Sequence, residues 1–138
     1  MSHHMQDMLK VHPRMSQMKM DRDALISCIQ ATSNAAQACS SCADACIGEK
    51  DIQSLIRCIR INLDCADVCN LTGTLLCRQT EPPMSLLRSQ LQACAMACQG
   101  CRQECQEHAS KYDHCRMCAD YCRQCEDACN RLLSSLQL

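Results

Sequence analysis

The apolar positions of this 138-residue chain recur with the period of an α-helix in four long segments. Apolar side chains return at steps of three and four, and these steps reach the same helix face because one turn takes about 3.6 residues. Short breaks separate the segments, and short connections force neighbouring helices to run antiparallel. The pattern predicts an all-α protein, an antiparallel up-down-up-down four-helix bundle with helices over residues 18–47, 51–79, 84–108 and 111–134.

The three breaks carry local signals for helix ends. Gly48 is typical of the residue that follows a helix, and Asp51 of the residue that caps the next one. The pair of prolines after Glu81 stops the second segment and opens the third, because proline is tolerated only in a first turn. Ser110 and Asp113 match a capping box, which predicts the start of the last helix there.

The first 17 residues form a separate region of the pattern. Met5 and Leu9 recur at helical spacing, and Pro13 ends the run. We therefore predict two parts, an N-terminal arm or short extra helix over residues 1–17 and the bundle domain over residues 18–138.

Cysteine occupies the helix positions at which a core would normally hold Leu, Ile or Phe. The stretch HCRMCADYCRQCEDAC places cysteines at 115, 118, 122, 125 and 129, so they form a stripe on one helix face. In the other three segments, every interval between cysteines is also a sum of threes and fours. We expect the stripes to face the bundle axis, with leucines such as Leu25, Leu63 and Leu132 on flanking positions that seal helix to helix.

Composition excludes several classes of function. The chain has 17 Cys, two Tyr and neither Phe nor Trp, and its net charge is −1. A nearly neutral chain with so few aromatic side chains has little to offer nucleic acid, which needs basic charge and stacking partners. No apolar stretch has the length of a membrane span or of a secretory signal, so we expect a cytoplasmic protein that does not enter a membrane.

The cysteines are expected to be free thiols or metal thiolates. Cytoplasmic thiols are kept reduced, and an odd number of them cannot pair completely within one chain. A few buried cysteines could serve as small apolar residues. The 17 of this chain could not, because their small side chains would leave cavities or require an unusually tight bundle, at a cost of several kcal/mol for each missing large residue. A purely structural role therefore does not explain the stripes.

The spacing of the cysteines favours a monovalent soft metal. Side chains at i and i+4 have Cβ atoms about 5–6 Å apart, so two sulfurs of one helix can converge on an ion that needs two or three ligands. Zn(II) normally requires four ligands in a tetrahedron, and iron–sulfur clusters use loop spacings that do not occur in this chain. We expect Cu(I) at about one ion per thiolate, on the order of 15–20 ions per chain, bound with release of protons.

The CxxC and CxxxC runs of these segments resemble those of the cytosolic copper storage proteins. Members of this family are four-helix bundles whose lumen is lined with cysteines that hold many Cu(I) ions. The resemblance covers residues 18–134, and the short N-terminal helical region agrees with it. It implies a homotetramer of bundles that sequesters cytosolic copper and is loaded through one end of each bundle.

The predicted metal ligands are the cysteines and one histidine. His108 continues the stripe of the third segment to its end, whereas His114, at the start of the fourth, is the weaker candidate. Asn62 lies on the stripe of the second segment and is expected to hydrogen-bond between helices. At the opposite end, Met18 and Met20 either fill irregular packing or bind Cu(I) reversibly. The full predicted set is Cys28, Cys39, Cys42, Cys46, Cys58, Cys65, Cys69, Cys77, Cys94, Cys98, Cys101, Cys105, His108, Cys115, Cys118, Cys122, Cys125 and Cys129.

The sequence predicts a protein that stores Cu(I) by binding and ligand exchange and that is not an enzyme. Two alternatives stay open, a general soft-metal (zinc) thiolate buffer and a thiol–disulfide redox protein. Redox CxxC motifs usually lie at an exposed helix N-terminus, and among the motifs of this chain only the one at Cys115 lies near a predicted N-terminus. The expected partners are copper ions and further copies of the chain, with no nucleic acid and no membrane.

Overall fold

The computed structural model describes residues 4–136 and shows an all-helical chain, with no β-strand in that range. A short helix precedes four long ones, and two 3-10 helices, Met15–Gln17 and Ile52–Leu55, lie in the connections. The predicted all-α fold class is confirmed. The α-helices are α1 (His4–Lys10), α2 (Arg22–Ile47), α3 (Ile56–Leu76), α4 (Met84–His108) and α5 (Asp113–Ser135).

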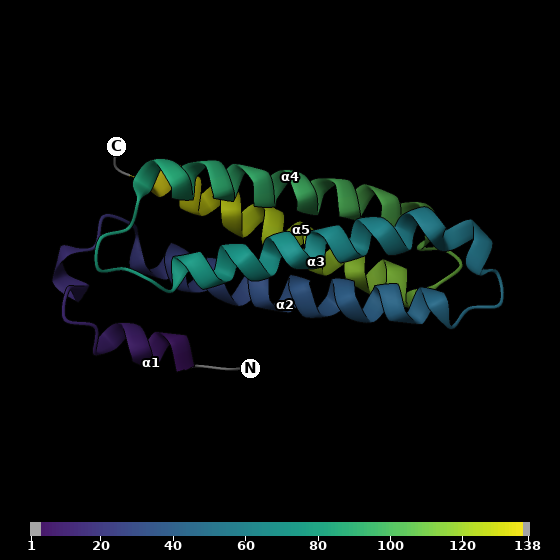
Figure 1. The fold of residues 1–138 in the computed structure, drawn as a ribbon, viewed down its shortest axis with the longest axis horizontal. Coiled ribbons are helices and arrows are strands. Elements are labelled where there is room, and N and C mark those ends of the chain that lie inside the picture. The colour runs from purple at the N-terminus through teal and green to yellow at the C-terminus, as the bar shows by residue number, and fades with distance from the viewer. Residues whose placement is uncertain (1–3, 137–138) are drawn as a thin grey trace.

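Helices α2 to α5 lie along one long axis, and each runs antiparallel to the next in the chain (Figure 1). Helix α1 lies outside this bundle and packs beside α2. The α2–α3 and α4–α5 connections meet at one end, which we call the histidine end because His108 and His114 lie there. The α3–α4 connection lies at the other end, which we call the methionine end after Met15, Met18 and Met20 in the segment before α2.

Helix α2 begins four residues later than residue 18, the start expected from the pattern. Met18 has an extended backbone with ψ 135°, so it lies outside the helix. The carboxylate of Asp21 accepts a hydrogen bond from the Ala24 backbone N–H, which satisfies one of the free donors of the first turn. The start of α2 is therefore defined by this N-cap and not by the apolar pattern.

Two of the predicted helix-end signals are confirmed, and two are wrong. Gly48 directly follows the end of α2, with a right-handed φ of −79°, whereas Asp51 makes no side-chain cap. The capping box at Ser110 does not form, because the backbone N–H groups of Lys111 and Tyr112 both bond to the carbonyl of His108 and extend the last turn of α4. The proline pair does open α4, which begins at Met84.

The bundle core contains thiols along its axis and leucines around them. The leucine prediction holds for Leu25 and Leu132, which are both 0% exposed, but it is wrong for Leu63, which is 48% exposed. On α3 the buried positions include Cys58, Asn62 and Cys65, and the residue after Asn62 points at least about 100° away from each of them because of the helical period. The buried leucines are Leu9, Leu25, Leu55, Leu76, Leu87, Leu91 and Leu132.

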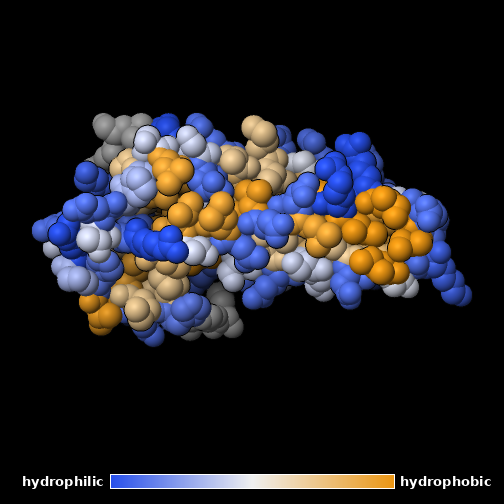
Figure 2. All heavy atoms as spheres, in the orientation of Figure 1, coloured by the Kyte–Doolittle hydropathy of each residue, from blue (hydrophilic) through white to orange (hydrophobic). Residues whose placement is uncertain are grey.

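Part of the outer surface is apolar. Figure 2 shows apolar side chains gathered on the face turned to the viewer, most densely toward the histidine end. On α3, the residues Ile56, Leu63 and Leu71 are each about half exposed. Between residues 4 and 136, none of the helices combines the length and the apolar character that crossing a bilayer requires.

Candidate metal centre

All 17 cysteines are free, and every one except Cys77 is buried. They come from all four long helices because each helix turns its cysteine stripe toward the axis of the bundle. We call the buried set the thiol column. Its members are Cys28, Cys39, Cys42 and Cys46 on α2, Cys58, Cys65 and Cys69 on α3, Cys94, Cys98, Cys101 and Cys105 on α4, and Cys115, Cys118, Cys122, Cys125 and Cys129 on α5.

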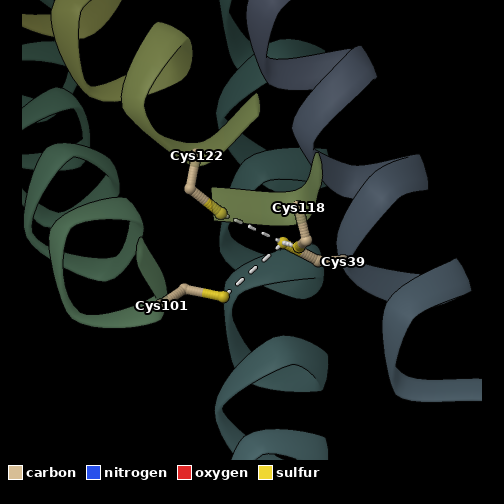
Figure 3. Close-up of side chains that lie close together, drawn as sticks. All are labelled: Cys39, Cys101, Cys118 and Cys122. Atoms are coloured by element: carbon tan, nitrogen blue, oxygen red, sulfur yellow. Dashed lines mark hydrogen bonds between the residues drawn. The ribbon is translucent and has the colours of Figure 1, made fainter. Parts of the chain in front are cut away.

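Four thiols from three helices meet near the middle of the column (Figure 3). The Sγ atom of Cys39 on α2 lies 3.8 Å from that of Cys101 on α4. The same sulfur lies 3.6 Å from Sγ of Cys122 and 3.8 Å from Sγ of Cys118, both on α5. All four sulfurs lie within 4.8 Å of one another, so one metal ion could contact several of them at once.

These sulfur–sulfur distances are those expected of ligands that share a metal. Two sulfurs bound at the ~2.3 Å of a zinc–sulfur bond lie about 3.8–4.0 Å apart in tetrahedral or trigonal geometry. The distance is 3.9 Å between Cys65 and Cys69, 3.6 Å between Cys69 and Cys98, and 3.8 Å between Cys28 and Cys129. The donor set therefore fits a soft metal without a large rearrangement of the helices.

A second group of four thiols lies between the central group and the methionine end. It consists of Cys69, Cys94, Cys98 and Cys125, all fully buried and within 4.8 Å of one another. Beyond it, the contact between Cys28 and Cys129 is the last one of the column. The thiol groups thus follow one another along the axis of the bundle.

Histidine imidazoles join the column at its other end. Nδ1 of His114 lies 3.4 Å from Sγ of Cys42, and with Cys46 and Cys115 these residues form a third possible metal group. Nε2 of the same ring lies 2.9 Å from a carboxylate oxygen of Glu49. This hydrogen bond orients the imidazole, as carboxylates commonly do for histidines that bind metals.

His108, the histidine predicted as a ligand, lies in a different group. Its Nε2 atom is 3.0 Å from a carboxylate oxygen of Glu104, and both residues are close to Cys58. Glu104 is only 7% exposed, and its other oxygen pairs with Nε of Arg57 at 3.0 Å. The direct contact between His114 and the thiols was missed because the sequence alone could not show that α5 places this ring beside Cys42 of α2.

Asn62 interrupts the column with an amide group. Its Nδ2 atom donates to the carbonyl of Cys58 at 2.8 Å. Its Oδ1 atom accepts from the thiols of Cys101 at 3.3 Å and Cys118 at 3.1 Å, which lie on two other helices. The predicted role as an interhelical hydrogen-bonding residue is confirmed, and these bonds satisfy a side chain that is fully buried.

The environment of the thiols controls how they lose protons. Burial raises the pKa of Cys46 to about 11. Hydrogen bonds to Cys105 and Cys115 raise the pKa of Cys42, whereas hydrogen bonds from Cys42 and Cys58 lower the pKa of Cys115. A thiol that ionises is stabilised by protonated neighbours, and its negative charge then opposes ionisation of those neighbours. Metal binding to a thiol whose pKa is raised, such as Cys46, therefore has to displace its proton.

Comparison with known proteins relates this arrangement to copper. A family model described as copper storage protein matches residues 21–134. The copper storage protein Ccsp of Streptomyces lividans, loaded with 10 copper equivalents, is 44% identical, with a TM-score of 0.93 over 96% of this chain and 99% of that chain. A structure of the cytosolic copper storage protein of Streptomyces lividans with five coppers is 46% identical, with a TM-score of 0.82 over 84% of this chain and 97% of that chain.

A third solved structure extends the comparison to a more distant protein. The Cu(I)-bound copper storage protein BsCsp3 is 32% identical, with a TM-score of 0.70 over 79% of this chain and 97% of that chain. The family match covers most of the chain, and the solved structures share its bundle over nearly their whole length. The chain belongs to the copper storage protein family.

Proposed function

We propose that this chain stores Cu(I) in the cytosol, holding many ions as copper thiolates in the thiol column. The observation that carries this proposal is the column of buried, free thiols at distances suited to sharing metal ions. The protein acts by binding and ligand exchange and has no catalytic turnover. Relatives whose solved structures contain copper support the choice of metal.

The proposed ligands are the sulfurs of the thiol column together with His108. We add His114, because its ring nitrogen lies at contact distance from Cys42. Cys77 lies outside the thiol column, and its sulfur contacts Sδ of Met5. The storage unit is proposed to be residues 18–138, since every cysteine lies there, and residues 1–17 are proposed to be an accessory arm.

The proposed load is on the order of 15–20 Cu(I) ions per chain, close to one per thiolate. At this ratio each positive ion balances one thiolate charge. A smaller number of ions, each held by two thiolates, would leave an excess negative charge in a buried column, which is costly. Bridging sulfurs reduce that charge, and the short contacts between neighbouring thiols support such bridging.

A zinc buffer is the second candidate, because four thiols within 4.8 Å of one another can also surround a tetrahedral ion. Two such groups are present, one around Cys39 and one around Cys69. A third group also offers four ligands, those of Cys42, Cys46, His114 and Cys115. Copper is preferred because thiols outside these groups, such as the pair Cys28 and Cys129, also lie at sharing distance, and two or three sulfurs satisfy Cu(I) but not Zn(II). A redox role is less well supported, since Cys115, the cysteine of a CxxC motif that lies nearest a helix N-terminus, is buried.

We further propose that the protein forms a homotetramer of bundles. The support from this chain is the half-exposed apolar face of α3, with Ile56, Leu63 and Leu71, which a neighbouring copy would cover. Sedimentation equilibrium of the wild-type protein tests the assembly. A second test is Leu63→Glu, which places a charge on this face and should yield smaller species.

The storage function is tested by anaerobic titration of the reduced, metal-free protein with Cu(I) against a chromophoric chelator, repeated with Zn(II). The proposal expects on the order of 15–20 Cu(I) ions withheld from the chelator and far fewer Zn(II) ions. A similar number of both ions would favour the general buffer. A capacity of only a few ions of either metal would exclude storage.

A further inference from the structure

Cys77 differs from all other cysteines because it lies outside the thiol column. It is the residue that ends α3, and it is partly exposed. Its thiol donates to the carbonyl of Gly73 at 3.2 Å. Its Sγ atom lies 3.7 Å from Sδ of Met5, a residue of α1 that is 72 positions away in the chain. Helix α1 thus brings a thioether against the one thiol that the column leaves out.

The two sulfurs line a pocket between α1, α2 and α3. This cavity has a volume of about 220 Å³. Its lining also includes Cys69, which is fully buried and belongs to the second group of four thiols of the column. Cys77 and Cys69 are eight residues apart on α3, a distance of about 12 Å along the helix axis. One cavity therefore has an outer sulfur pair and an inner storage thiol on its walls.

Helices α2 and α3 approach each other closely at one point of the pocket wall. An added Cβ atom at Gly73 would lie 2.8 Å from Oγ1 of Thr32 on α2. Both residues line the pocket, and the Thr32 hydroxyl is held in place by its hydrogen bond to the carbonyl of Ile29 at 2.9 Å. The absence of a side chain at Gly73 therefore helps to keep the cavity open between the two helices.

The chemistry of the outer pair suits a monovalent soft ion. A thiolate and a thioether are both soft donors, and their separation of 3.7 Å is close to the distance of about 3.8–4.0 Å expected of two sulfurs on one metal. On binding, the Cys77 thiol loses its proton to solvent and its sulfur bonds to Cu(I), which leaves a site without net charge. A thioether is neutral and binds more weakly than a thiolate, so the ion can leave again.

We propose that Met5 and Cys77 bind one Cu(I) ion at the mouth of this pocket, outside the thiol column, and that this ion exchanges with the column through Cys69. The site is a lateral one on the flank of the bundle, separate from the histidine end. This inference rests on the proposed storage of Cu(I), and its failure can be distinguished from the failure of storage.

The test uses the reduced full-length protein and follows alkylation of Cys77 by iodoacetamide with peptide mass spectrometry. In the metal-free protein, Cys77 should be the first thiol labelled, since the others are buried. Saturation with Cu(I) should slow this labelling, and Met5→Leu should weaken the protection at least ~10-fold, the loss typical even for an outer-shell partner of a metal ligand. Met8→Leu, at an exposed methionine of the same helix, is the matched control and should behave as the wild type.

Two results would overturn the site. One is labelling of Cys77 in the copper-saturated protein at the rate of the metal-free protein while the total copper content is on the order of 15–20 ions. The other is an equal loss of protection in Met5→Leu and Met8→Leu. A total content of only a few ions would instead contradict storage itself.

The route through Cys69 has its own test, the rate at which the column fills from a Cu(I)–chelator complex. Cys77→Ser and, independently, Gly73→Ala should slow filling while the column reaches its wild-type content. Cys77→Ser avoids any change in helix packing, so it remains informative where Gly73→Ala disturbs the fold. Wild-type filling rates in Cys77→Ser would exclude transfer through this pocket.

Discussion

The two ends of the thiol column differ in the groups that surround the sulfurs. At the histidine end, Cys42 touches His114, and Glu104 pairs with His108 and Arg57. At the methionine end, Leu25 and Leu132 are completely buried. One end places imidazole and carboxylate groups beside the thiols, whereas the other closes the core with hydrocarbon.

This difference indicates how a core made of thiols can be both stable and loadable. Cysteine buries little apolar surface, so the hydrophobic stabilisation of the bundle has to come from larger side chains. Those side chains include Leu9 of α1 and the leucines at the methionine end. The charged and imidazole groups lie at the histidine end, where His114 contacts Cys42, and we expect copper loading to depend on them.

The largest expected effect is on stability at the methionine end. Leu132→Ala removes a fully buried side chain and should lower the free energy of unfolding of the metal-free protein by about 2–5 kcal/mol. Leu86→Ala, at a position 49% exposed, is the control and should cost less than about 0.5 kcal/mol. Chemical denaturation followed by circular dichroism measures both. Equal losses would contradict the assignment of stability to the buried leucines.

The second largest expected effect is on the pH dependence of the Cu(I) affinity. Burial raises the pKa of Cys46 to about 11, so this thiol is protonated at neutral pH and its proton must leave when copper binds. The apparent Cu(I) affinity should therefore rise with pH, by about tenfold per pH unit for each proton displaced. Chelator competition at pH 6, 7 and 8 measures the slope. An affinity independent of pH would mean that the thiols are already ionised.

The third expected effect is on the rate of copper loading, which compares the histidine end of the column with the methionine end. His114→Ala removes a ring that contacts Cys42 and should slow copper loading by about tenfold while leaving capacity within about one ion. Met18→Leu makes a conservative change at the methionine end and should leave the rate unchanged. Stopped-flow transfer from a Cu(I)–chelator complex measures both variants. The same slowing in both would remove the functional distinction between the ends.

The smallest effect is on capacity in the middle of the column. Replacing Cys118 and Cys122 with Ser should lower the copper content by about two ions, at about one ion per thiolate, without unfolding the bundle. Met117→Leu, at an exposed methionine on the same helix, should change nothing. Metal analysis combined with circular dichroism separates lost sites from lost structure. Unchanged copper content in the double variant would rule out the column as the store.

The helices were predictable because periodicity is a property of one segment at a time. The four long helices and the proline start of α4 agree with the pattern. Their ends were less predictable, since a cap such as Asp21 depends on backbone geometry that the pattern does not contain. The buried face was predicted well for cysteines but not for Leu63, because a residue beside a stripe can point to the core or to solvent.

The sequence by itself determined the class of fold, the alignment of the thiols on one face of each helix, the soft character of the ligands and the family to which they belong. Only the tertiary structure decided which thiols share a group, that His114 reaches Cys42, and that Cys77 meets Met5 outside the column. The reason is physical. Spacing along one helix follows from covalent geometry, whereas distances between helices depend on their rotation and axial offset, which packing of the whole bundle sets.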